Sequence, residues 1–158
     1  MAVKNSYPQL PEVAYQKTSI DMSMIIAYAK DLIGKYDKET VRMAYAIFRN
    51  ESGNGKYGVN NNYAGIQADA GVWKCLPGVP IATTVKIDNA GDTRRFLVFN
   101  KAFGYQISFE LLCIKIVERG IRTTNDYYDK WVAVPRLKTE SAVKNFNSLL
   151  NSAKKEIL

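Results

Sequence analysis

The carboxyl group of Glu51 stands at the end of a predicted helix. Four apolar residues recur there at i, i+3, i+4 and i+7, which predicts a buried helical stripe: Val41, Ala44, Tyr45 and Phe48. Glu51 follows one turn later, and the turn-forming residues 52–55 end the helix directly after it. Partial burial and the negative end of the helix dipole both favour the protonated form of a carboxyl group. A general acid needs that form, whereas a solvated glutamate at a helix end is the alternative interpretation.

Amide and aromatic residues follow Glu51 closely in the run Asn60-Asn61-Asn62-Tyr63-Ala64-Gly65-Ile66-Gln67. Amide groups both donate and accept hydrogen bonds, as tyrosine hydroxyls do. Such side chains suit the hydroxyl and N-acetyl groups of sugars. An acid followed by this run therefore indicates a carbohydrate site.

These two segments together resemble the lysozyme-like glycosidases that cleave peptidoglycan. The resemblance is closest to the bacterial and phage β-N-acetylglucosaminidases of the flagellar and autolysin type, in which a helix ends in Glu-Ser-Gly. Their loop then reads Asn-Asn-(Leu/Tyr)-(Phe/Ala)-Gly-Ile-(Lys/Gln), and residues 51–53 and 61–67 follow that order. Gly65-Ile66-Gln67 also resembles the Gly-(Leu/Ile)-x-Gln element of lytic transglycosylases. The resemblance covers roughly residues 40–120 and includes Thr83-Thr84, a hairpin, Phe99 and the helix around Ser108.

The resemblance implies a role for each matching residue. Glu51 is the expected general acid, and Tyr63 is expected to bind the N-acetyl group or to stabilise an oxocarbenium ion, unless it packs in the core. Further residues are expected to bind substrate: Asn61, Asn62, Gly65, Gln67 and Tyr128. Trp73 is expected either to stack on a sugar or to lie in the core, because sugar C–H faces pack on aromatic rings.

A second catalytic carboxylate is missing from its expected place. Glycoside hydrolysis commonly uses two carboxyl groups, and the glucosaminidases often carry the second in a Thr-x-Glu element. Here Val85 and Lys86 follow Thr83-Thr84. The nearest substitutes are Asp88 and Asp92 at the hairpin turn, with Asp69 as a further candidate, although a turn residue is the alternative interpretation of each. A site with a single catalytic glutamate can instead use the substrate's N-acetyl group as the nucleophile, or it can form an anhydro sugar as lytic transglycosylases do.

Composition excludes several kinds of chemistry. The chain has no histidine, so imidazole-based triads and most zinc catalysis are excluded, and we expect no metal or cofactor. The net charge of +7 is typical of a chain that meets an anionic polymer such as nucleic acid, a membrane surface or cell wall, with simple solubility as the alternative interpretation, and no nucleic-acid motif accompanies it. Cys75 and Cys113 are expected to be free thiols.

The predicted fold is mainly α within the α+β class. We expect an N-terminal arm over residues 1–17 and one lysozyme-like, two-lobed domain over residues 18–158. Helices are predicted from about Met22, up to Glu51, over 105–119, over 125–132 and over about 139–156, with a hairpin over 83–99. The helix over 105–119 is apolar nearly all round, so it is expected to be buried on every side at the centre.

The sequence therefore predicts a glycosidase acting on the glycan strands of peptidoglycan, either an N-acetylglucosaminidase or a lytic transglycosylase. The alternative is a non-catalytic wall-binding or structural module of a phage particle or secretion device. Neither nucleic-acid binding nor membrane insertion is expected, since no apolar run is long enough to span a bilayer. The expected place of action is the bacterial cell wall, in the periplasm or outside the cell. Since no signal peptide is visible, delivery is expected on a phage particle or by another route.

Overall fold

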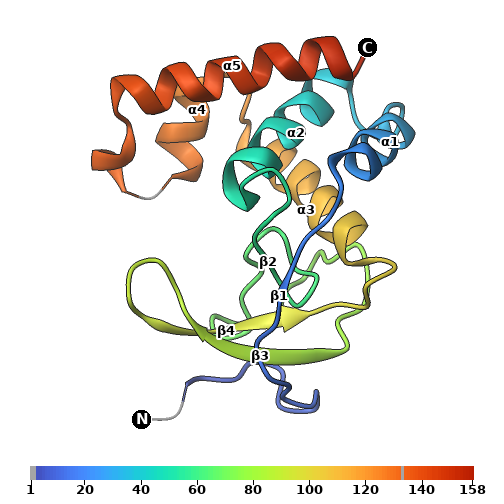
Figure 1. Ribbon diagram of the computed structural model, residues 1–158, viewed down its shortest axis with the longest axis vertical. Coiled ribbons are helices and arrows are strands. Elements are labelled where there is room, and N and C mark those ends of the chain that lie inside the picture. Colours follow the sequence, from blue (N-terminus) through green and yellow to red (C-terminus); the bar gives the residue numbers. More distant parts are fainter. Residues whose placement is uncertain (1–2, 133) are drawn as a thin grey trace.

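The helices gather at one end of the molecule and a β-hairpin lies at the other (Figure 1). The computed structural model describes residues 3–132 and 134–158. Five α-helices and two small antiparallel sheets occur within these residues, which gives the α+β class. The short turn of chain that carries β2 passes between the helices and the hairpin, directly after the end of α2 (Figure 1).

Helices α1 (Met22–Leu32) and α2 (Lys38–Ser52) begin and end at local signals. The side chain of Asp21 accepts a hydrogen bond from the Ser23 amide, and Asp37 accepts one from the Thr40 amide at 2.7 Å. Gly53 ends α2 in the left-handed conformation with φ of 58°, which glycine adopts without strain. The predicted end of the helix directly after Glu51 is therefore confirmed.

Helix α3 (Gly104–Arg119) lies between two apolar clusters. Phe109, Leu112 and Ile116 pack with α1, α2 and α5, whereas Ile107 and Leu111 pack with the hairpin half. The prediction of a helix buried on every side is wrong for its last turn, where Val117 is 58% exposed. Gly120 ends the helix in the left-handed conformation, as predicted.

The last fifth of the chain packs against α2. It consists of α4 (Thr124–Asp126), the π-helix η1 (Tyr127–Trp131), the 3₁₀ turn η2 (Pro135–Leu137) and α5 (Glu140–Glu156). Helix α5 runs across the end of the helical half that is farthest from the hairpin (Figure 1). Its Phe146 stacks on Tyr127 with ring centroids 4.2 Å apart, which fixes η1 against α5.

The predicted hairpin consists of β3 (Ala82–Ile87) and β4 (Thr93–Val98). Its antiparallel register pairs Thr84 with Phe96 and Lys86 with Arg94. Asp88 closes the turn by accepting hydrogen bonds from the amides of Ala90 and Asp92, both at 2.9 Å. Since side chains alternate along a strand, Lys86 and Phe96 lie on the same face of the hairpin.

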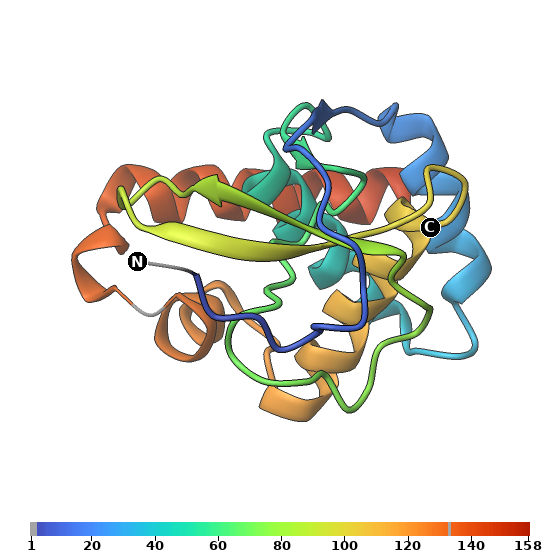
Figure 2. The same ribbon diagram turned by 90° about the horizontal axis from the view of Figure 1, so that it is seen from below.

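The N-terminal arm is extended, as predicted, but it is built into the hairpin half. The Val13 amide donates to the Thr83 carbonyl, and the Ser6 amide donates to the Ala68 carbonyl. The arm ends in β1 (Lys17–Thr18), which pairs antiparallel with β2 (Gly58–Val59). It lies along one face of the hairpin half before it reaches α1 (Figure 2).

Both cysteines are free thiols, with Cys113 buried in the core and Cys75 half-buried. No helix within residues 3–132 and 134–158 has the length and apolarity needed to cross a bilayer.

Candidate active site

Glu51 lies in the last turn of α2, where it lines two cavities. The larger one, which we call the helical cavity, measures about 500 Å³ and is otherwise lined by residues of α2, η1, η2 and α5, with Val132. The smaller one, the hairpin cavity, measures about 180 Å³ and is lined by the loop 57–65 and by the hairpin. Glu51 is the one described residue that lines both cavities.

The carboxyl group of Glu51 is exposed, which differs from the partial burial expected from the sequence. Ile47 and Phe48 are fully buried and pack into the core, so they do not shield the carboxyl group.

A hydrogen-bond chain orients Glu51. The hydroxyl of Tyr127 donates to Glu51 Oε1 at 2.8 Å and accepts from Asn50 Nδ2 at 3.0 Å. Tyr127 is only 1% exposed, and its burial raises the pKa of its hydroxyl, which the nearby Glu51 charge raises further. Tyr127 is therefore a fixed hydrogen-bond donor to one oxygen of Glu51, which leaves the other oxygen available to a ligand.

The π-helix η1 presents aromatic residues to the helical cavity. Tyr127, Tyr128 and Trp131 all line it, and π-helical turns are frequent at functional sites. The pKa of Tyr128 is raised by burial and then by the charge of Glu51. The structure thus brings Tyr128, one of the residues expected to bind substrate, into the same cavity as Glu51.

The loop after α2 forms the floor of the hairpin cavity. Tyr63 is buried, its ring packs on Phe48 at 5.8 Å, and burial raises its pKa. Gly65 has a φ of 60° and no atom within 4 Å of where a side chain would start, so it leaves the cavity open. Tyr63 and Gly65 therefore lie in the same cavity as Glu51.

The two asparagines hold this loop in place. Asn62 is buried and donates to the carbonyls of Ile66 and Leu97, both at 2.9 Å, while its Oδ1 accepts from the amides of Ala64 and Ile66. Asn62 also lines the hairpin cavity, although its side chain is hydrogen-bonded to backbone groups of the loop and of β4. Asn61 donates to the Phe99 carbonyl and lines a different cavity, so the structure does not bring it to Glu51.

Asp88 lines the hairpin cavity together with Glu51, as the sequence suggested. Its Oδ1 accepts the two backbone hydrogen bonds that close the hairpin turn. The same residue therefore satisfies the turn interpretation and faces the cavity.

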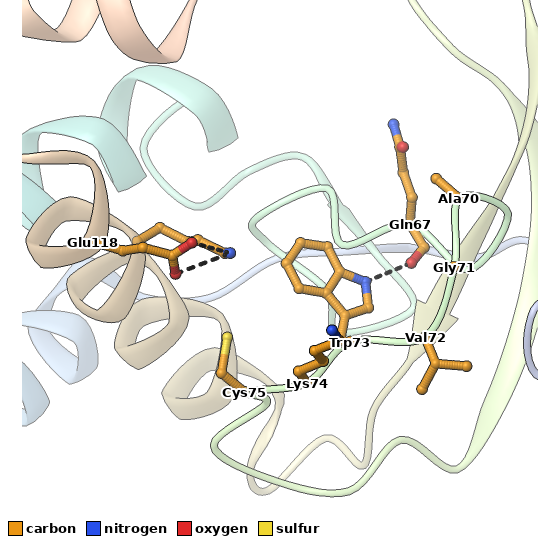
Figure 3. Close-up of a pocket in the computed structure, with 9 residues that line it drawn as sticks. Gln67, Ala70, Gly71, Val72, Trp73, Lys74, Cys75 and Glu118 are labelled. Carbon is orange, nitrogen blue, oxygen red and sulfur yellow. Dashed lines mark hydrogen bonds and ion pairs between the residues drawn. The ribbon is translucent and has the colours of Figure 1, made fainter.

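Trp73 and Gln67 lie in a separate cavity of about 470 Å³, which shares no residue with the two that Glu51 lines. Figure 3 shows the indole nitrogen of Trp73 donating to the Gln67 carbonyl, while the Gln67 side chain extends away from the ring. That side chain accepts from Arg94 at 2.6 Å. The ammonium of Lys115 lies 5.4 Å from the centre of the Trp73 ring. The structure does not bring Trp73 or Gln67 to Glu51.

Several cavity residues carry no sequence motif: Asn50, Tyr57, Lys86, Asn89 and Trp131. The hairpin register was the one sequence signal that could have placed Lys86 on the face of Phe96. Tyr57 and Asn50 flank the Glu-Ser-Gly element but had no signal of their own.

Comparisons with protein-family models, with curated proteins and with solved structures found no match to this chain.

Proposed function

We propose that this protein is a peptidoglycan-cleaving glycosidase with a lysozyme-like, two-lobed fold, in which Glu51 is the general acid. The observation that carries this proposal is the position of Glu51 between the helical cavity and the hairpin cavity. A glycan strand lying through both cavities would place one glycosidic oxygen beside the Glu51 carboxyl group. The order of Glu51-Ser52-Gly53 and residues 61–67 along the chain supports the same substrate class.

The hydrogen bond from Tyr127 supports a catalytic use of Glu51. A general acid must be held within hydrogen-bond reach of the oxygen that it protonates. Tyr127 is itself fixed by stacking on Phe146, so it restricts the rotation of an otherwise exposed side chain.

The lining of the two cavities favours a mechanism with one carboxylate. Besides Glu51, Asp88 is the carboxylate among the described residues that line them, and it is hydrogen-bonded within its turn. Glu51 would protonate the glycosidic oxygen as the bond to the sugar C1 breaks. The resulting carboxylate would then accept the proton of a hydroxyl that attacks C1. When that hydroxyl belongs to the same sugar, the product is an anhydro sugar; when it belongs to water, the product is a reducing end.

Digestion of purified sacculi tests the proposal. The wild-type chain is expected to release sugar fragments, and Glu51→Gln is expected to release none, because the amide keeps the shape but has no acidic proton. Glu39→Gln, on the same helix and lining neither cavity, serves as the control and should keep full activity. Mass spectrometry of the products separates anhydro-muramyl ends from reducing N-acetylglucosamine ends. Full activity of Glu51→Gln would exclude Glu51 as the acid.

A non-catalytic wall-binding module of a phage particle or secretion device is the second candidate function. It is favoured by the two backbone hydrogen bonds that Asp88 accepts within the hairpin turn, because they leave Glu51 without a free second carboxylate. In that case the wild-type chain would sediment with sacculi without lowering their turbidity. For either function, the proposed place of action is the bacterial cell wall.

A further inference from the structure

The hairpin cavity has a positively charged wall that general acid chemistry does not require. Lys86 of β3 lines it, on the same face of the hairpin as Phe96. The ammonium of Lys86 lies 5.1 Å from the centre of the Tyr15 ring, and it forms no ion pair with any described residue. An aromatic face orients a cation without neutralising it. Lys86 is therefore held in place with its charge available.

An exposed ring and a second cation stand beside this wall. The Tyr57 ring lines the hairpin cavity and is 63% exposed. One edge of the ring lies against Gly53, where a side chain would start only 2.5 Å from the ring. The ammonium of Lys17 lies 4.7 Å from the ring centre, and Lys17 also forms no ion pair with a described residue. The hairpin cavity thus combines an exposed aromatic ring with the Lys86 ammonium, while the Lys17 ammonium lies against that ring and does not line the cavity.

Other charges near this cavity are already engaged. Arg94, the pairing partner of Lys86 in the hairpin, forms a two-point ion pair with Asp69 at 2.8 Å. Asp88 accepts two backbone hydrogen bonds through Oδ1, and its carboxylate lies beyond ion-pair distance of Lys86. Glu51 and Asp88 are the carboxylates that line the same cavity, so among its described lining residues Lys86 is the cation that can attract a bound anion.

We propose that the hairpin cavity binds a sugar bearing a carboxylate substituent, with Lys86 as the group that recognises the carboxylate and Tyr57 as the stacking surface for the ring. This assignment of the substrate class rests on the proposed function, and it makes the enzyme selective for carboxylated glycans over neutral polymers of N-acetylglucosamine. In peptidoglycan the carboxylate has two sources, the stem peptide or the lactyl group that a removed stem leaves behind.

Equilibrium binding to the Glu51→Gln chain tests this site without turnover. Three ligands of equal length are compared: glycan strands with stem peptides, the same strands after an amidase has removed the stems, and neutral N-acetylglucosamine oligomers. All strands are freed of teichoic acid beforehand. Adding Lys86→Gln is expected to raise the Kd for at least one carboxylated ligand about ten-fold, the effect of one charge-assisted contact. The Kd for the neutral oligomer should stay unchanged.

Lys101→Gln is the matched control, because it removes the same charge from a residue that lines a different cavity. It should leave all three Kd values unchanged. If Lys86→Gln weakens binding only to strands with stems, Lys86 recognises the peptide carboxylate. If it weakens binding only to stripped strands, Lys86 recognises the lactyl group. Equal losses for charged and neutral ligands, or equal effects of the Lys86 and Lys101 variants, would overturn the assignment.

Different measurements test the proposed catalysis and the proposed carboxylate site, so either proposal can be wrong while the other holds. If the wild-type chain releases no fragments from sacculi, the proposed catalysis is wrong, whereas the charge-selective binding is decided by the Kd values alone. If fragments are released but Lys86→Gln changes no Kd, the catalysis holds and the carboxylate site is wrong.

Discussion

At the scale of single residues, the contact between Tyr127 and Glu51 joins two parts of the chain that are 76 residues apart. The tyrosine hydroxyl is buried, accepts from Asn50 and donates to the exposed carboxylate. Because burial and the Glu51 charge both raise its pKa, Tyr127 stays protonated across the working range of pH. It is therefore a positioning residue for Glu51 rather than a proton carrier.

Tyr127→Phe should lower kcat about ten-fold with little change in KM, because one hydrogen bond to a charged group is lost while the cavity keeps its shape. The ring would still stack on Phe146, so the thermal midpoint should fall only slightly. The measurement is steady-state kinetics on soluble glycan strands, together with thermal unfolding.

Tyr45→Phe provides the comparison for that variant. Tyr45 also donates a buried hydroxyl to a glutamate, Glu156, but it lines neither cavity of Glu51. The Tyr45→Phe variant should be less stable than wild type, with an unchanged kcat. A Tyr127→Phe enzyme with unchanged kcat would show that the hydrogen bond does not position the acid.

At the scale of elements, α3 is tied to the α1–α2 connection through a buried carboxylate. Glu110 is 6% exposed, pairs with Lys35 at 2.5 Å and accepts from the hydroxyls of Tyr36 and Tyr28. Burial alone would raise the pKa of Glu110, but the ion pair and the hydroxyl groups outweigh it and lower that pKa. In turn, burial and Glu110 raise the pKa of Tyr28 to about 12.

Glu110→Gln should lower the free energy of unfolding at pH 7 by about 1–3 kcal/mol, because Lys35 and two tyrosines lose a charged partner. A carboxyl group with a lowered folded pKa stabilises the protein above its unfolded pKa of about 4.3. That stabilisation disappears as the pH falls through the folded pKa. The difference between wild type and variant should therefore shrink from pH 7 to pH 3 in denaturant titrations.

Glu118→Gln on the same helix is the control, because its ion pair with Lys115 is exposed. It should change stability by less than about 0.5 kcal/mol at either pH. A Glu110 effect that is equal at pH 7 and pH 3 would mean that shape, not charge, stabilises this contact.

The ends of the elements could be predicted from the sequence because their signals are local. Asp37, Gly53 and Gly120 each act within a few residues of the helix end that they set. The burial of α3 was predicted less well, because whether its last turn is covered depends on where α1 and the hairpin half end. No local pattern indicated that a charged Glu110 would lie in that buried face.

The site was predictable only where it coincides with a local motif. Glu51 follows from the end of α2, and residues 62–65 follow it closely enough to share its cavity. Trp73 and Gln67 were expected there as well, but the loop after Gln67 turns toward Lys115 and encloses a separate cavity. Lys86 depends on long-range pairing, which residue order along one strand does not reveal.

At the scale of the whole molecule, one buried guanidinium adds several side-chain hydrogen bonds to the backbone bridges that attach the N-terminal arm to the hairpin half. Arg95 donates to Glu12 at 2.5 Å, to Thr83 at 3.0 Å, and to the carbonyls of Lys4 and Val3 at 3.2 and 3.4 Å. The arm also places the Tyr15 ring against Lys86 and the Lys17 ammonium against Tyr57, and both Lys86 and Tyr57 line the hairpin cavity. The position of the arm therefore affects the residues that surround this cavity.

Arg95→Lys should loosen the arm without unfolding the helices, because one ammonium cannot reproduce the several donors of a planar guanidinium. The Ser6 and Val13 amides, which donate to Ala68 and Thr83, should lose about ten-fold of their protection from hydrogen exchange. Amides in the middle of α3 should keep theirs. Arg94→Lys, the neighbouring substitution, disturbs the Asp69 pair instead and should leave the two arm amides protected. Unchanged protection at Ser6 and Val13 would show that the backbone bridges hold the arm alone. A uniform loss that includes α3 would show that the arm and the helices unfold as one unit.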